Sequence, residues 1–305
     1  MSAGNQKVSI LGVPLDLGAS KLGATGGPDA IRRTGISKAL EALNYDVIYD
    51  DDIEVEERPD DQGNSKTRFK KQIIKVCEDL ADAAYKALKK GSIPLTLGGD
   101  HSLAMGSVAG SWKYFKEKKQ NIGLIWVDAH GDMNTSATSP SGNIHGMPLA
   151  SLLGLGDKKL VGIGGKGAKV KARNVVLIGI RDLDENEKHN LRETGVTVFT
   201  MKEIDRYGMP RICERAIEAA SDQTDGIHVS FDIDAADPAL AVGTGTKARG
   251  GLTYRECHLL MEMFADSEML CALDMVEVNP LEDAFNQTAV LASELIQSAF
   301  GKSIF

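Results

Sequence analysis

Three short segments combine aspartate and histidine in a way that could bind metal ions. They read GGDHS at 98–102, DAHGD at 128–132 and SFDID at 230–234. In an extended chain, residues two apart point to the same side. Asp128, His130 and Asp132 can therefore point into one cleft, and Asp232 and Asp234 can do the same from another strand. Four carboxylates and two imidazoles that converge there would repel one another strongly without bound cations. The combination therefore predicts a metal site.

The make-up of this site limits the kind of metal. Six ligands are too many for one zinc ion with an open position, and they suit two ions that share carboxylates. An oxygen-rich set without thiolate favours two Mn²⁺ ions, for which Co²⁺ or Ni²⁺ could substitute. Two such ions about 3.5–4 Å apart lower the pKa of a bridging water, so the predicted chemistry is hydrolysis by a metal-bound hydroxide. The predicted ligands are His101, Asp128, His130, Asp132, Asp232 and Asp234.

Each of these residues, taken singly, has an ordinary structural explanation. An aspartate after a strand is usually a helix N-cap or a turn former, and a lone histidine such as His101 is usually structural. The metal interpretation depends on all three segments meeting at one place. That in turn depends on the elements that carry them.

The elements around these segments predict a parallel α/β fold. Short, nearly continuous apolar runs alternate with amphipathic stretches, as in strands buried on both faces of a parallel sheet covered by helices. All three segments then follow strands, at the carboxyl edge where such sheets bind ligands. We predict a single three-layer α-β-α domain over 1–305 with a mostly parallel central sheet of about eight strands. The strand runs are 8–13, 46–50, 93–97, 122–128, 174–180, 196–200, 226–234 and 269–278, and the helix patterns are 67–90, 103–119, 210–221, 253–266 and 285–300.

Composition disfavours some partners and favours others. The 305 residues include 35 lysines and arginines against 43 aspartates and glutamates, which gives a net charge of −8. Without a long basic block, nucleic acid is not expected as a partner, whereas an acidic balance suits a cationic substrate. Four scattered cysteines without a CxxC pair indicate reduced thiols. With no signal-peptide pattern and no long apolar run, we predict a cytoplasmic protein that has no membrane segment.

Longer motifs connect these segments to a family. The three metal-site segments together resemble the ureohydrolase superfamily, and SGNIHG at 141–146 and GGLTYRE at 250–256 resemble arginases, bacterial ones above all. The resemblance runs from GVP at 12–14 to EVNP at 277–280, nearly the whole chain. It implies an arginase/deacetylase-like fold. It also implies a hydrolase of linear amidines that converts L-arginine to L-ornithine and urea, with two Mn²⁺ ions and a bridging hydroxide.

The same resemblance implies roles for single residues. Asp128 and Asp232 would bridge the two ions. His145 would pass a proton to the leaving amine, since an imidazole titrates near neutral pH. Glu277 would pair with the guanidinium, and Thr246 would lie beside it. The implied catalytic residues are His145, Glu277 and Asp132, and the implied ligand sets are His101, Asp128, Asp132 and Asp232 for one ion and Asp128, His130, Asp232 and Asp234 for the other.

The far end of the substrate separates arginine from other guanidino compounds. Asn134, Ser141 and Asn143 match arginase positions that bind the α-carboxylate, and Asp184 and Glu187 match those that face the α-ammonium. The two acids could equally be helix-start residues. A related amidinohydrolase acting on agmatine or another guanidino compound is the main alternative. A metal-loaded protein without turnover and a deacetylase-like enzyme with one zinc ion are two further ones.

Three features depart from the family pattern. Ala235 and Ala236 stand where arginases usually have Gly-Leu, and Lys247 stands where proline is usual. Lys247 places a flexible cation beside a site for a cationic group. The glycine-rich loop 162–167 matches nothing in the pattern. The resemblance also implies a homotrimer or homohexamer, and the helix at 285–300 could be buried at an interface or in the monomer core.

Overall fold

The computed structural model describes residues 6–304, so residues 1–5 and 305 of the predicted domain lie outside the described part. It contains one sheet of eight strands in the order β2-β1-β3-β8-β7-β4-β5-β6. All neighbouring strands are parallel, which confirms the predicted parallel sheet. The strands are β1 Lys7–Val13, β2 Asp46–Tyr49, β3 Ser92–Gly98, β4 Gly123–Val127, β5 Val175–Ile180, β6 Thr197–Thr200, β7 Ile227–Asp232 and β8 Leu270–Val276.

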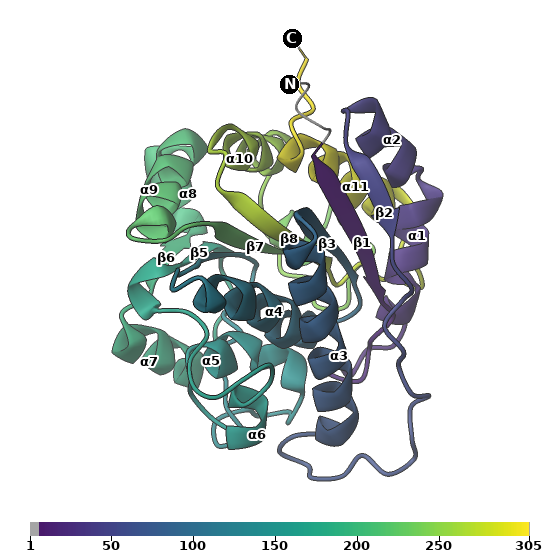
Figure 1. Ribbon diagram of the computed structural model, residues 1–305. Helices are drawn as coiled ribbons and strands as arrows, with labels where there is room; N and C mark the ends of the chain where they lie inside the picture. Colours follow the sequence, from purple (N-terminus) through teal and green to yellow (C-terminus); the bar gives the residue numbers. More distant parts are fainter. Residues whose placement is uncertain (1–5, 305) are drawn as a thin grey trace.

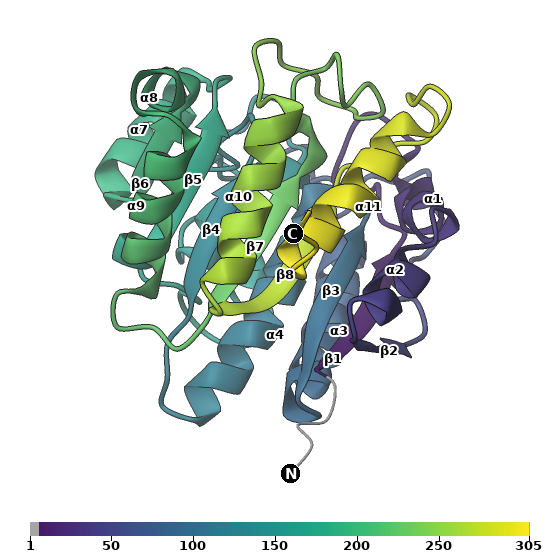
Figure 2. The ribbon, with the colours of Figure 1, turned by 90° about the horizontal axis from the view of Figure 1, so that it is seen from above.

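Helices cover both faces of this sheet (Figure 1). Figure 2 shows α10 and α11 lying over its middle strands. No helix within residues 6–304 is long and apolar enough to cross a membrane. One face carries α1 Gly27–Arg33, α2 Ile36–Ala42, α8 Met201–Tyr207, α9 Met209–Ser221, α10 Tyr254–Asp266 and α11 Gln287–Ala299, and the other carries α3 Lys70–Lys89, α4 Ala104–Glu117, α5 Pro148–Leu152, α6 Lys158–Val161 and α7 Glu185–Thr194.

Strand β4 shows why the strands read as continuous apolar runs. Its Leu124 and Trp126 pack into the core shared with α4 and α5, while Ile125 and Val127 pack into the core shared with α9 and α10. Both faces of the strand are dry, so alternation with polar residues is absent. The predicted helices α3, α4, α9, α10 and α11 coincide with their sequence ranges apart from a few terminal residues, where helices commonly fray.

The prediction that residues 128–132 and 232–234 are extended is wrong. Strand β7 ends at Asp232, and Asp234 lies in the 3-10 turn Ile233–Ala235. Residues 128–132 follow β4 without strand structure, and Asp132 has a φ of 48°. His101 begins another 3-10 turn, His101–Leu103. The side chains therefore meet through turns at nearby strand ends, and not through alternation along one strand.

Candidate metal centre

The carboxyl ends of β3, β4 and β7 bring the first group of predicted ligands together around His101. Its Nδ1 lies 3.1 Å from Asp128 Oδ2 and 3.1 Å from Asp132 Oδ2. Asp232 Oδ2 is 3.3 Å from the same nitrogen. This nitrogen is buried and has no hydrogen-bond partner among residues 6–304. Three carboxylates and one imidazole nitrogen thus enclose a position that suits a divalent cation.

His130 organises the second group on the other side of Asp128. Its Nδ1 lies 3.4 Å from Asp128 Oδ1 and 3.1 Å from Asp234 Oδ2. The ligand atoms of His101, Asp128 and Asp232 lie within 4.8 Å of one another, and so do those of Asp128, His130 and Asp234. Because Asp128 belongs to both groups and offers a different oxygen to each histidine, the arrangement fits two ions that share a carboxylate.

Local turns hold these carboxylates in place. Asp128 Oδ1 accepts a hydrogen bond from the N–H of His130 at 2.6 Å, and Asp232 Oδ1 accepts one from the N–H of Asp234 at 2.8 Å. Asp234 Oδ2 accepts the hydroxyl of Thr246 at 2.9 Å. An aspartate that accepts a backbone N–H two residues on is an ordinary turn former. Asp128 and Asp232 therefore form turns and still face the cluster.

Burial and repulsion shift the pKa values in the cluster. Burial raises the pKa of Asp132 to about 6, with a further contribution from Asp128. Burial, followed by Asp234 and Asp128, raises the pKa of Asp232 well above its usual range. Burial lowers the pKa of His101, but its carboxylate partners outweigh that effect and leave it well above its usual value. Protons here balance charge that divalent cations would balance instead.

His145 and Glu277 form a pair beside the cluster. His145 Nδ1 lies 3.1 Å from Glu277 Oε1. Glu277 follows β8 with a φ of 62°, and its Oε1 also accepts the N–H of His101 at 2.9 Å. Burial lowers the pKa of His145, but the neighbouring Glu277 has the larger effect and raises this pKa to about 9. Burial raises the pKa of Glu277, but His145 brings it below its usual value. The pair is therefore an imidazolium and a carboxylate at neutral pH.

Two adjoining cavities open onto these groups. One, of about 130 Å³, is lined by ligands of the cluster together with Asn134 and Glu187. The other, of about 210 Å³, is lined by Asn143 among others. His145 and Thr246 line both cavities. A substrate in either cavity would therefore lie against the predicted proton-transfer residue.

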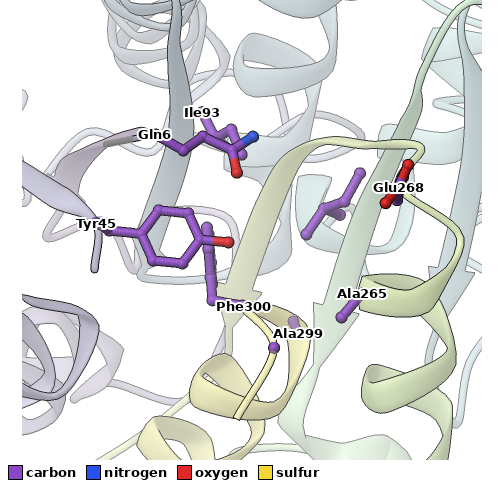
Figure 3. A pocket seen from close by; sticks show the side chains of 9 residues that line it. Gln6, Tyr45, Ile93, Ala265, Glu268, Ala299 and Phe300 are labelled. Atoms are coloured by element: carbon purple, nitrogen blue, oxygen red, sulfur yellow. The ribbon is translucent and has the colours of Figure 1, made fainter. Parts of the chain in front are cut away.

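A larger cavity, of about 460 Å³, lies at the opposite, amino end of the strands (Figure 3). Figure 3 shows the ring of Tyr45 close to Phe300, and their ring centroids are 5.2 Å apart. Glu268 is the one carboxylate among its lining residues, which include no histidine. Cavity size therefore does not locate the metal centre here, whereas the clustering of ligand atoms does.

Sequence reasoning missed a buried polar network behind the cluster. His101 Nε2 lies 3.0 Å from Ser230 Oγ, and Ser230 donates to Asp274 Oδ2 at 3.2 Å. His228 Nε2 is 2.9 Å from the same carboxylate oxygen. The signal that could have found this network is the spacing of His228, Ser230 and Asp232. They are polar at every second position of an otherwise apolar strand.

Comparison with known proteins shows to which family the chain belongs. The model of the family described as Arginase family matches residues 6–301. The chain belongs to the arginase family. The arginase of Bacillus caldovelox is 48% identical over 299 residues, which cover 97% of this chain and 99% of that one. The arginase of Brevibacillus brevis is 46% identical over 300 residues, which cover 98% of this chain and 99% of that one. A solved structure of the Bacillus caldovelox arginase has a TM-score of 0.94 at 47% identity, covers 98% of this chain and 100% of that chain, and confirms the predicted fold class.

This member of the arginase family accommodates its unusual residues without disturbing the cluster. Lys247 Nζ pairs with Glu282 Oε2 at 3.0 Å. The carbonyls of Ala235 and Ala236 accept hydrogen bonds from the guanidinium of Arg181 at 2.9 Å and 3.3 Å. The extra cation is thus paired with a carboxylate that also pairs with Lys21, and the two alanines lie in a backbone turn that Arg181 holds.

The glycine-rich loop of this arginase-family chain closes around Lys169. Its Nζ donates to the carbonyls of Val161, Gly165 and Gly167 at 2.7 Å, 2.8 Å and 2.7 Å. Burial lowers the pKa of Lys169 to about 8. Three carbonyls around one ammonium satisfy its donors, so this lysine organises the loop and is not free for a ligand.

Three of the residues expected at the amino acid end of an arginase substrate, Asn134, Asp184 and Glu187, are connected by hydrogen bonds. Asn134 Nδ2 donates to Asp184 Oδ2 at 2.8 Å, and Asp184 Oδ1 caps α7 by accepting the N–H of Glu187 at 3.0 Å. Burial raises the pKa of Glu187 to about 7. Asn143 lies at one cavity, whereas Ser141 and Asp184 line neither of the two. The alternative explanation of Asp184 and Glu187 as helix-start residues is thus correct for their hydrogen bonds.

Proposed function

We propose that the chain hydrolyses L-arginine to L-ornithine and urea with two Mn²⁺ ions. The observation that carries this is the double use of Asp128, which joins two ligand groups beside the His145–Glu277 pair in a member of the arginase family. When bound, the ions would supply a water molecule of lowered pKa for attack on the guanidinium carbon. Co²⁺ or Ni²⁺ could replace Mn²⁺, because the donor set does not discriminate sharply among these ions.

The proposed ligand sets extend the two observed groups. Asp128 and Asp232 would contribute to both ions, and the remaining ligands would serve one ion each. The sets are His101, Asp128, Asp132 and Asp232 for one ion and Asp128, His130, Asp232 and Asp234 for the other.

Glu277 is the proposed partner of the substrate guanidinium. A carboxylate and a planar guanidinium form a charge-assisted pair, which would hold the reacting carbon in position. In the metal-free protein the charge of Glu277 keeps the pKa of His145 at about 9. A bound guanidinium neutralises that charge, so His145 becomes acidic enough to give its proton to the leaving amine. Binding would thus prepare proton transfer.

The far end of the substrate decides between arginine and its relatives. Asn134, Ser141 and Asn143 are proposed to hold the α-carboxylate. Asp184 and Glu187 are proposed to face the α-ammonium, and capping α7 keeps both acids at this edge. Agmatine lacks the carboxylate, so it would forgo the contacts of the three residues proposed to hold that group. An amidinohydrolase acting on agmatine or another guanidino compound is the alternative.

Urea release tests this proposal. The protein is loaded with Mn²⁺ or treated with chelator and then given L-arginine or agmatine. We expect Mn²⁺-dependent urea from arginine and far less from agmatine. The reverse preference would establish the alternative, and bound Mn²⁺ without urea from any guanidino compound would indicate a protein without turnover. One zinc ion per chain would instead point to deacetylase-like chemistry.

The resemblance also implies a cytoplasmic protein that assembles as a homotrimer or homohexamer. Both stay predictions. Light scattering after size-exclusion chromatography would test the assembly, because the mass of one chain is 32.7 kDa.

A further inference from the structure

A seam of polar side chains runs between α4 and the sheet, inside the core. His228 and Ser230 lie two residues apart on β7 and share a face with Asp232. Ser107 and Ser111 lie one turn apart on α4. The side chains of Ser107, Ser111, His228 and Ser230 are no more than 1% exposed. Buried polar groups cost free energy unless they are hydrogen-bonded, so their partners show what the seam does.

Asp274 on β8 is the centre of this seam and lies opposite Ser230 in the sheet register. Its Oδ2 accepts the hydroxyls of Ser107 at 2.6 Å and Ser230 at 3.2 Å, and it lies 2.9 Å from His228 Nε2. The other ring nitrogen of His228 is 3.0 Å from Ser111 Oγ. Burial raises the pKa of Asp274, but His228 and the hydroxyls outweigh it and leave the pKa below its usual value. The carboxylate is therefore ionised.

Hydrogen-bond chemistry dictates the direction of the path from Asp274 to His101. An ionised carboxylate can only accept, so the Ser230 hydroxyl must donate to Asp274. The Ser230 oxygen is then left to accept, and the group 3.0 Å from it is His101 Nε2. This nitrogen must carry a proton. The remaining ring nitrogen of His101, Nδ1, is the one that faces the carboxylates of the cluster.

We propose that Asp274 is a positioning residue that acts through Ser230 to set His101 in the tautomer that can bind a metal ion. Stacking of His101 on Trp126, with centroids 3.9 Å apart and planes 9° apart, holds the ring plane. The path through Ser230 to Asp274 keeps a proton on Nε2 of this ring. The inference rests on the proposed metal site, and it adds a residue that touches neither the ions nor the substrate.

Two matched serine variants test the path. Ser230→Ala cuts the link to His101, whereas Ser107→Ala removes a different donor to the same oxygen of Asp274. Ser230→Ala removes the hydrogen bond that holds a proton on Nε2 of His101. The three carboxylates around Nδ1 then favour a proton on that nitrogen instead, and this proton competes with Mn²⁺. We expect Ser230→Ala to lower the affinity for one of the two Mn²⁺ ions by about 10–100-fold, the usual effect of losing a hydrogen-bond partner of a metal ligand. Ser107→Ala should change the affinity for neither ion by more than about twofold.

Binding is measured by electron paramagnetic resonance of free Mn²⁺ in titrations of each folded variant. A double-mutant cycle adds a readout that a merely structural role would not move. Asp274→Ala should weaken Mn²⁺ binding in the wild-type background and cause no further loss in the Ser230→Ala background, although it lowers stability in both. Additive losses of affinity would overturn the inference.

The serine pair decides even if Asp274→Ala does not fold. Equal effects of Ser230→Ala and Ser107→Ala would overturn the path, and so would unchanged Mn²⁺ affinity in Ser230→Ala. Wild-type protein that binds no Mn²⁺ would instead contradict the proposed function, so the two failures are distinguishable.

Discussion

The two histidines expected to bind metal lie in contrasting surroundings. The side chain of His101 is 1% exposed, and its Nε2 faces Ser230 in the core. The side chain of His130 is 25% exposed, and its Nε2 lies 4.0 Å from Asp182, whose own side chain is 70% exposed. The imidazole of His101 thus belongs to a buried hydrogen-bond path, whereas that of His130 lies near a carboxylate that water also reaches.

This difference indicates that metal binding by similar ligands can depend to different degrees on the residues that contact those ligands. A buried donor that loses its acceptor bears the full desolvation cost, whereas an exposed pair exchanges protein contacts for water at little cost. Substitutions around His101 should therefore affect metal binding far more than those around His130. The expected outcomes below run from the largest effect to the smallest.

Removing the carboxylate that both histidines share should abolish the difference between them. Asp128→Ala takes a ligand from both groups, so both Mn²⁺ ions should be lost and urea release should fall by on the order of 10³-fold. Elemental analysis of the purified variant gives the metal content. Asp184→Ser, which keeps a cap on α7 and removes an acid outside both groups, should retain its metal. Normal metal content in Asp128→Ala would refute the shared-ligand arrangement.

A third histidine separates proton transfer from metal binding. His145→Asn leaves both ligand groups intact, so Mn²⁺ content should stay unchanged while kcat falls by about 100-fold. Steady-state urea release and metal analysis on the same preparation check this. An unchanged kcat would remove His145 from the reaction, and a loss of metal would place it with His101 and His130.

His145 also tests whether pairing with a carboxylate affects the pKa of a histidine more than burial does. Burial lowers the pKa of His145, but Glu277, with Asp100 and Asp132, outweighs burial and raises this pKa from 6.5 to about 9 in the folded, metal-free protein. The resulting stability is fully present below about pH 6.5 and is lost as the pH rises through about 9. Between these values the free energy of unfolding of the metal-free protein should fall by about 1–3 kcal/mol relative to His145→Asn. Urea denaturation measures it, and parallel pH profiles would contradict the pairing.

The smallest effect is expected at the exposed support of His130. Asp182→Asn removes a carboxylate 4.0 Å from His130 Nε2 that is largely in water. Exposed pairs contribute little, so Mn²⁺ affinity should change by no more than about twofold. A loss of about tenfold or more would make this acid equivalent to the path through Ser230 and would end the distinction between the two histidines.

Much of the site could be predicted because its ligand residues lie in short segments of the sequence. His101, Asp128 and Asp232 each stand at the end of an apolar run, and parallel strands end at a common edge. The structure brings these residues together as expected. The turns that do so were not predicted, since an aspartate that accepts a backbone N–H can replace extended chain within two residues.

The support behind His101 could not be predicted in the same way. His228 and Asp274 are 46 residues apart in the chain and touch because β7 and β8 are neighbours. Strand order is a property of the whole sheet, and no local pattern states it. A polar residue inside an apolar run signals a buried partner without saying which one it is.

The amino-acid sequence by itself determined the parallel sheet, its covering helices and the acidic and imidazole residues at the strand ends, because hydrophobic periodicity and residue chemistry act over a few positions. Only the tertiary structure decided which residues support them. It placed Ser230 between His101 and Asp274, left His130 partly exposed and directed Lys247 to Glu282. Burial and pairing depend on what the rest of the chain places nearby, and those two quantities set the proton and metal chemistry.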